Sequence, residues 1–345
     1  MQKRFLKYVT FDTQSCEKSQ TIPSTVGQTV LIKHLAQEME EIGLEDITIN
    51  KYGDLIATIP STLSEELTAK VPVVGFLAHV DTATDLSGKD VKPQIFKYEG
   101  GDIVINKELD VVLKAEQLEP YIGHSIITSD GTTLLGADDK AGVAEIMNAA
   151  EYLINNPDIK HGTIRIAFTH DEEIGLGMQN FDAKEFGAKY AYTIDGGALG
   201  SLEYETFNAA RAEVTFKGLS VHPGYAKDKM INAAHQAVLF DNALPQERPE
   251  STCGREGFYH MMSMEGGCES ATLNYIIRDH DSEIFAQRKQ IITETAEQFG
   301  GKVTIKDQYR NMGEVIETMP EVVDIAIEAM KACEVEPKIE AVRIG

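Results

Sequence analysis

The chain has 345 residues, of which 42% are hydrophobic and 25% charged, a composition typical of a globular protein with two domains or one domain carrying a large insertion. Its formal net charge of -23 argues against nucleic acid or an anionic membrane as a partner, because both require a basic face. The four cysteines lack CxxC spacing, no apolar signal region follows the start MQKRFLKYVT, and no apolar run could span a bilayer, so we expect a cytoplasmic protein without disulfides.

The first predicted helix lies between Pro23 and Gly43. Gly43 stands where a left-handed residue would end a helix, and the apolar residues before it recur at helical spacing: Leu31, Leu35, Met39 and Ile42. Two strand-like runs follow, at 46–50 and 55–60. The four residues between them predict a hairpin turn.

Three short apolar runs further along the chain predict buried parallel strands, at residues 73–78, 163–168 and 190–194. A helix is predicted to begin near Gly142, between the first two runs. Each run ends in polar residues: His79 and Asp81 after the first, His170, Asp171, Glu172 and Glu173 after the second, and Asp195 after the third. In open α/β sheets ligands bind at the carboxyl ends of the strands, so we expect these side chains along one rim.

Each polar group has an ordinary explanation when it is taken alone. His79 beside Asp81 is compatible with a surface histidine near an acid, and Asp138 with a favourable charge at the start of a helix. The acidic triplet 171–173 is compatible with a solvated turn, although adjacent carboxylates repel one another unless positive charge lies nearby.

Taken together, the same groups indicate a metal site. Gly136 and Gly142 flank the Asp138-Asp139 pair and permit the close backbone approach that a carboxylate between two cations requires. One histidine with several carboxylates and no cysteine is typical of a catalytic rather than a structural zinc site.

The pattern changes after about residue 206. Apolar and polar residues alternate over 211–217, which predicts a half-exposed strand, and a helix, a strand, a helix and a strand follow. This order predicts a small α+β sandwich inserted at about 207–314. A helix at 320–333 is expected to return to the first domain.

The order and content of the motifs resemble a known family. HVDT, GADDKAG, DEEIG and DGG occur in the sequence order of the di-zinc aminopeptidase and carboxypeptidase superfamily. FNAA, VHPG, EGFYH and YIIRD extend the resemblance, which is strongest to the peptidase T (tripeptide aminopeptidase) family and spans essentially the whole chain. It implies an α/β fold, with a mixed sheet flanked by helices as in zinc exopeptidases and an inserted α+β sandwich that acts as a lid. The catalytic domain would comprise residues 1–206 and 315–345.

The resemblance implies two zinc ions that share the carboxylate of Asp138. The first ion would also be bound by His79 and Asp195, and the second by Glu173. Two metal ions that act together typically lie about 3.5–4 Å apart, and at that distance they require a shared anionic ligand.

The resemblance also implies roles for residues outside the ligand set. Asp81 would orient the histidine ligand, and Glu172 would be the general base that takes a proton from the water between the metals. In the lid, His222 would stabilise the oxyanion and Arg278 would bind the terminal carboxylate of the peptide, while Arg343 aligns with a substrate-binding arginine. Without the resemblance, His222 reads as a turn histidine and Arg278 as an exposed charge.

Two features depart from the family pattern. His170 stands where close relatives have proline. It is compatible with an additional group near the metal or with a surface histidine, and we favour the surface histidine. The sequence ends at Gly345, before the Gly-Gly-Thr-Asp-Gly loop and the histidine that completes the second zinc site, and Ile344 stands where glycine is expected. We therefore expect the C-terminal part of the catalytic domain to be missing and the second zinc to bind weakly.

The sequence thus predicts a di-zinc exopeptidase that releases the N-terminal residue from tripeptides. A related dipeptidase, carboxypeptidase or N-acyl amino acid deacylase remains an alternative, as does a catalytically impaired peptide-binding protein. The expected partner is a short peptide, and a homodimer is left open.

Overall fold

The computed structural model describes residues 1–343, so the predicted departure at Ile344 lies outside the described residues. The chain divides into two compact units, Met1–Gly197 and a second that begins at Ala198. No helix in the described part of the chain combines the length and apolar character that a membrane span requires.

The first unit is built on a five-stranded sheet with the order β1-β2-β8-β3-β9. Strand β3 pairs in parallel with β8 and β9, whereas β2 is antiparallel to both β1 and β8. The predicted hairpin and the three predicted parallel strands are therefore present, and the sheet is mixed. The prediction that all three are buried is wrong for β9, which ends the order of the sheet and has no buried residue, whereas β3 and β8 are largely buried. The strands comprise β1 (Glu45–Ile49), β2 (Leu55–Ile59), β3 (Val74–His79), β8 (Ile164–Thr169) and β9 (Tyr190–Thr193).

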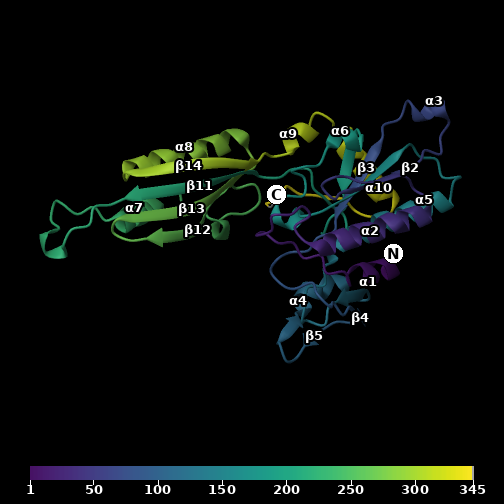
Figure 1. Ribbon diagram of the computed structural model, residues 1–345, viewed down its shortest axis with the longest axis horizontal. Helices are drawn as coiled ribbons and strands as arrows, with labels where there is room; N and C mark the ends of the chain where they lie inside the picture. The colour runs from purple at the N-terminus through teal and green to yellow at the C-terminus, as the bar shows by residue number, and fades with distance from the viewer. Residues whose placement is uncertain (344–345) are drawn as a thin grey trace. The chain divides into compact units, whose positions relative to one another are not determined.

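Three helices supply the main core of this unit: α1 (Gln2–Tyr8), α2 (Val26–Ile42) and α5 (Ala137–Asn155). Helix α2 ends at Gly43, whose φ of 96° is left-handed as the sequence predicts. Helix α5 packs on β3, and α2 packs on β1, β2 and α5 (Figure 1). A smaller apolar cluster contains Ile56, Leu77 and Phe186. Because Ile56 alternates with the main-core residues Leu55 and Ala57, this cluster covers the other face of the sheet.

Smaller elements complete the first unit. Two antiparallel pairs, β4 with β7 and β5 with β6, lie in the segment between β3 and α5 and were not predicted. Their bounds and those of the short helices are β4 (Gln94–Lys97), β5 (Ile103–Asn106), β6 (Val111–Leu113), β7 (Ser125–Thr128), α3 (Glu65–Thr68), α4 (Ala115–Leu118), η1 (Glu119–Tyr121), η2 (Glu172–Ile174) and α6 (Ala183–Phe186).

The second unit contains a four-stranded antiparallel sheet with the order β12-β13-β11-β14. Helices α7 and α8 pack on it and on each other, and α8 lies along β14 (Figure 1). Inward residues alternate along the central strands, as in Leu273, Tyr275 and Ile277, which gives the predicted sandwich of one sheet and one helical layer. The elements are β11 (Asn208–Lys217), α7 (Ala233–Ala243), β12 (Phe258–Gly266), β13 (Ser270–Asp279), α8 (Ser282–Gln298) and β14 (Gly301–Tyr309).

The remaining elements of the second unit flank this sandwich in sequence. Strands β10 (Ser201–Leu202) and β15 (Lys338–Ile339) pair in parallel. The other elements are η3 (Pro223–Tyr225), η4 (Pro249–Ser251), α9 (Gly313–Ile316) and α10 (Glu321–Ala332). The elements of the sandwich run from residue 208 to residue 309. The predicted bounds of the insertion, 207–314, and the return of the following helix to the first domain stay predictions.

Candidate metal centre

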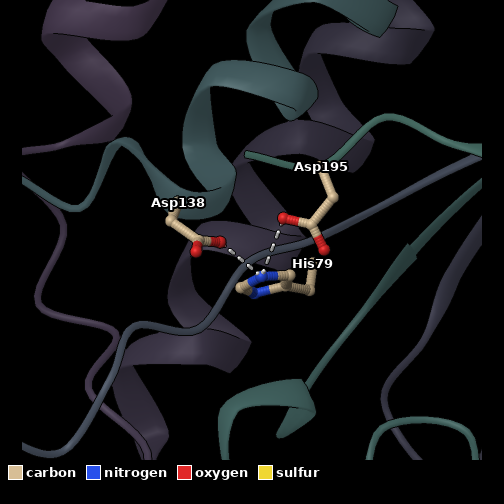
Figure 2. Close-up of side chains that lie close together, drawn as sticks. All are labelled: His79, Asp138 and Asp195. Atoms are coloured by element: carbon tan, nitrogen blue, oxygen red, sulfur yellow. Dashed lines mark hydrogen bonds and ion pairs between the residues drawn. The ribbon is translucent and has the colours of Figure 1, made fainter. Parts of the chain in front are cut away.

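Three polar side chains meet at the carboxyl edge of the first unit's sheet. His79 is the last residue of β3, Asp195 follows β9, and Asp138 lies in the first turn of α5. Because β3 and β9 are parallel neighbours, their carboxyl ends lie at the same edge. One possible ligand atom from each residue lies within 4.8 Å of the other two (Figure 2). Nε2 of His79 is 2.9 Å from Oδ1 of Asp138 and 3.8 Å from Oδ1 of Asp195. The three residues predicted to hold the first ion are thus brought together.

A glycine lets the start of α5 approach the end of β9. A Cβ at Gly142 would lie 1.9 Å from the carbonyl oxygen of Ile194, so no larger residue fits without moving the backbone. The close approach that the sequence predicts at this glycine is confirmed. The backbone at Asp138 and Asp139 is not helical, although both residues fall within the bounds of α5. The Asp138 carboxylate points toward His79 (Figure 2).

The second acid of the pair, Asp139, holds the backbone of the site. Its buried carboxylate accepts hydrogen bonds from the N–H groups of His79 and Gly142, each at 3.1 Å. It therefore ties the end of β3 to the first turn of α5. The sequence does not reveal this role of Asp139, because an acid beside another acid at a helix start has no distinguishing pattern.

Asp81 contacts both the histidine and the acidic loop. Its Oδ1 lies 3.3 Å from Nδ1 of His79, and both side chains are buried. Nδ1 has no hydrogen-bond partner of good geometry, and the contact is an ion pair when the imidazole is protonated. The same carboxylate accepts the backbone N–H groups of Glu172 at 3.0 Å and Glu173 at 3.1 Å. The predicted contact between Asp81 and the histidine is present, and the contact with the loop is additional.

The two glutamates begin the short helix η2. Oε2 of Glu172 lies 3.9 Å from Nε2 of His79, which places this carboxylate beside the three clustered residues. Glu173 is half-buried and does not belong to the group of three. Burial and the charge of Asp138 raise the pKa of Glu173 to about 7.

The electrostatics are those of several acids around one imidazole. Burial lowers the pKa of His79, but its contacts with Asp138 and Asp81 raise it to about 11. The hydrogen bond from His79 lowers the pKa of Asp138, while burial raises the pKa of Asp195. Burial and the charge of Asp195 raise the pKa of Asp139 to about 8. A divalent cation would relieve the repulsion among the neighbouring carboxylates. One imidazole nitrogen with several carboxylate oxygens is a donor set that suits zinc. The residues present therefore fit a metal ion.

The predicted substrate-binding residues lie in the second unit. His222 is exposed, precedes η3 and accepts the N–H of Gly224 at 3.2 Å. Arg278 lies on the face of β13 opposite the core, as predicted, and its guanidinium is 5.4 Å from the ring centre of Tyr309. Arg343 donates to the carbonyl oxygens of Gly254 at 3.0 Å and Glu256 at 2.8 Å.

The interpretation of His170 as a surface histidine is wrong. Its side chain is 2% exposed, and its Nδ1 lies 2.8 Å from Oδ1 of Asp54 in a buried ion pair. The explanation for the acidic triplet also needs correction at Asp171. This carboxylate is buried and receives hydrogen bonds from Ser24 and Gln28, so no metal is needed to compensate its charge.

Comparison with known proteins gives a consistent set of relatives. Residues 204–304 match the M20 peptidase dimerisation domain. Peptidase T of Listeria welshimeri is 55% identical over 355 residues, covering 99% of this chain and 86% of the relative. Peptidase T of Bacillus licheniformis is 52% identical over the same shares of the two chains.

Solved structures resemble the fold of this chain. Aminopeptidase PepT from Bacillus cereus has a TM-score of 0.75 at 25% identity, covering 100% of this chain and 86% of that one. A tripeptidase from Staphylococcus aureus has a TM-score of 0.75 at 22% identity, with 100% and 84% covered. A dinuclear metal-binding M20 peptidase from Bacillus subtilis has a TM-score of 0.61 at 13% identity, with 99% and 82% covered.

Proposed function

Since the chain belongs to the peptidase T family, we propose that it is a metal-dependent aminopeptidase that releases the N-terminal residue from tripeptides. The observation that supports this most directly is the convergence of His79, Asp138 and Asp195 within 4.8 Å at the carboxyl edge of the sheet. A metal-dependent exopeptidase needs a water activated by the metal and a nearby base. The metal site and the neighbouring Glu172 would supply them at this edge.

We propose zinc as the metal, with two ions in the complete site. His79, Asp138 and Asp195 would bind one ion, and Asp138 would share its carboxylate with a second ion that Glu173 also binds. Zinc bound in this way lowers the pKa of its water to about 7 and stabilises negative charge on the reacting carbonyl oxygen.

Two residues of the chain would complete the reaction. Glu172 would be the general base, because its Oε2 lies 3.9 Å from Nε2 of His79 and its side chain is 51% exposed, so a water can reach it. Asp81 would hold the imidazole in the orientation that presents Nε2 to the ligand site, since it contacts the other ring nitrogen at 3.3 Å.

The second unit would recognise the substrate. We assign the terminal carboxylate of the tripeptide to Arg278, because a guanidinium binds a carboxylate through two parallel hydrogen bonds. We assign the oxyanion to His222 and a further substrate contact to Arg343. The match of residues 204–304 to a dimerisation domain supports a homodimer. All four cysteines are free, which supports a reducing compartment such as the cytoplasm.

A substrate panel tests this function. The purified chain, supplemented with zinc, is incubated with a tripeptide, the corresponding tripeptide amide and an N-acylated amino acid, and products are identified by mass spectrometry. We expect release of the N-terminal residue from the tripeptide, slower cleavage of the amide and no deacylation. Release of the C-terminal residue, or hydrolysis of the acylated amino acid alone, would favour a carboxypeptidase or a deacylase. Peptide binding without turnover would indicate a binding protein.

A further inference from the structure

A buried polar cluster connects the N-terminal part of the chain to the two glutamates of the acidic loop. It contains Ser15, Ser24, Gln28, Asp81 and Asp171, none of which is more than 7% exposed. The loop residue Asp171 has a left-handed φ of 52°, a conformation that Asp tolerates better than most residues.

Gln28, on α2, contacts Asp171 at two points. Its Oε1 accepts the backbone N–H of Asp171 at 3.0 Å, and its Nε2 donates to Oδ1 of Asp171 at 2.7 Å. Ser24 adds its own N–H to Oδ2 of Asp171 at 2.7 Å and its hydroxyl to Oδ1. Gln28 is fully buried, so water cannot replace these bonds without opening the structure.

The next two amides of the loop are bound in the same manner. Oδ1 of Asp81 accepts the N–H of Glu172, and Oδ2 accepts the N–H of Glu173, while the hydroxyl of Ser15 donates to Oδ2. Three consecutive backbone amides therefore donate to two buried side chains, Gln28 and Asp81, which come from two distant parts of the chain. The direction of each glutamate side chain follows from the backbone that these bonds hold.

We propose that Gln28 is a positioning residue for Glu172 and Glu173. Its amide group fixes the backbone of Asp171, and the Asp171 backbone in turn sets where both glutamate carboxylates point relative to His79. This inference rests on the proposed function, because it assumes that Glu172 acts on a water and that Glu173 binds a metal ion. Gln28 itself touches neither.

The test compares two single variants with a charge-conserving double variant. Gln28→Met keeps the size of the side chain and removes both hydrogen bonds. Gln28→Glu places a carboxylate against the carboxylate of Asp171. In Gln28→Glu with Asp171→Asn, the exchanged groups can again form both bonds, because the oxygens of residue 28 accept the N–H and the side-chain amide of residue 171. The matched control is Gln37→Met, at an exposed glutamine of α2 whose side chain donates to Glu41 of the same helix.

Three quantities are measured for each variant: zinc affinity by competition with a chromophoric chelator, kcat and KM on a tripeptide, and thermal unfolding by circular dichroism. We expect Gln28→Met and Gln28→Glu to weaken binding of the zinc ion that Glu173 is proposed to hold by about 10- to 100-fold and to lower kcat by about the same factor, as loss of a group that orients a ligand typically does. KM should change by less than about threefold. The double variant should recover most of both losses, and Gln37→Met should match the wild type.

A role in fold stability alone would lower the unfolding temperature and leave the zinc affinity and kcat of the folded protein unchanged. That result for Gln28→Met, or an unfolded double variant, would overturn the proposal. Failure of the proposed function is distinguishable, because it appears in the wild type as a lack of tripeptide hydrolysis. Failure of the positioning role appears only in the variants of an active wild type.

Discussion

Glu172 lies beside the three clustered residues but is not proposed to bind a metal ion, so its role as a base can be tested separately from metal binding. We expect Glu172→Gln to lower kcat by about 10²- to 10⁴-fold, because the amide cannot accept a proton from the water. The number of bound metal ions should stay the same, since this carboxylate is not proposed as a ligand. Kinetics and metal analysis by mass spectrometry of the same preparation check both statements. Glu185→Gln, at an exposed position of α6, is the control. Loss of an ion from Glu172→Gln would place Glu172 among the ligands.

Substitution of Asp138, unlike that of Glu172, is expected to remove the bound metal. Its carboxylate lies 2.9 Å from Nε2 of His79 and is proposed to be shared by two cations, which repel strongly at such separations when no anion lies between them. Asp138→Ala should therefore lose both metal ions and with them all activity, whereas Asp158→Ala, at an exposed acid beyond the end of α5, should lose neither. Tight retention of two ions by Asp138→Ala, seen in metal analysis, would exclude a shared carboxylate at this position.

At the scale of elements, the N-terminal segment and α2 are packed too closely for any side chain at residue 27. A Cβ at Gly27 would lie 1.6 Å from the carbonyl oxygen of Asp12. We expect Gly27→Ala to lower the free energy of unfolding by about 1–3 kcal/mol, because the backbone of one segment must move. Chemical denaturation gives this value, and Val30→Ala, at an exposed position of α2, is the control. A change within about 0.5 kcal/mol for Gly27→Ala, typical of a surface site, would mean that the two segments separate easily.

The elements that the sequence predicted share one property, which is a periodic apolar face. Strands β3 and β8 bury nearly continuous apolar runs, β9 alternates half-buried and exposed residues, and α2 carries its buried residues at helical spacing. Strand β12 was missed because its second half, from Ser263 onward, is exposed on both faces and therefore has no alternation. The pairs β4–β7 and β5–β6 are short and half-exposed, so they carry little pattern.

Part of the site was predictable from the sequence, because some of its residues stand at the ends of elements that have a periodic apolar face. His79 and Asp195 follow apolar runs that form the parallel neighbours β3 and β9 of the mixed sheet, so local sequence was enough to place them at one edge. Asp138 stands at the predicted start of a helix rather than after a strand. Gln28 and His170 could not be found in this way. A glutamine in a helix and a histidine in an acidic loop usually face solvent, and only the pairing of segments far apart in the chain buries them.

At the scale of the whole molecule, the two units have separate apolar cores, and the proposed ligands all belong to the first. We expect removal of metal by a chelator to lower the unfolding temperature of the first unit only, because a bound ion stabilises the folded state that binds it. Scanning calorimetry should show one transition that shifts with chelator and returns with added zinc, and one that does not. Two unchanged transitions would mean that no metal binds tightly in the first unit.

The spacing of the clustered residues along the chain has a consequence for how the protein folds. His79 and Asp138 are 59 residues apart, Gln28 and Asp171 are 143 apart, and Asp195 comes last of all. Contacts between such distant residues form slowly, because the entropy of closing long loops opposes them. During synthesis no complete binding site can exist until residue 195 has left the ribosome and β9 has joined the sheet. A metal ion therefore cannot serve as a nucleus for folding here, and capture of the ion marks a chain whose first sheet is already assembled.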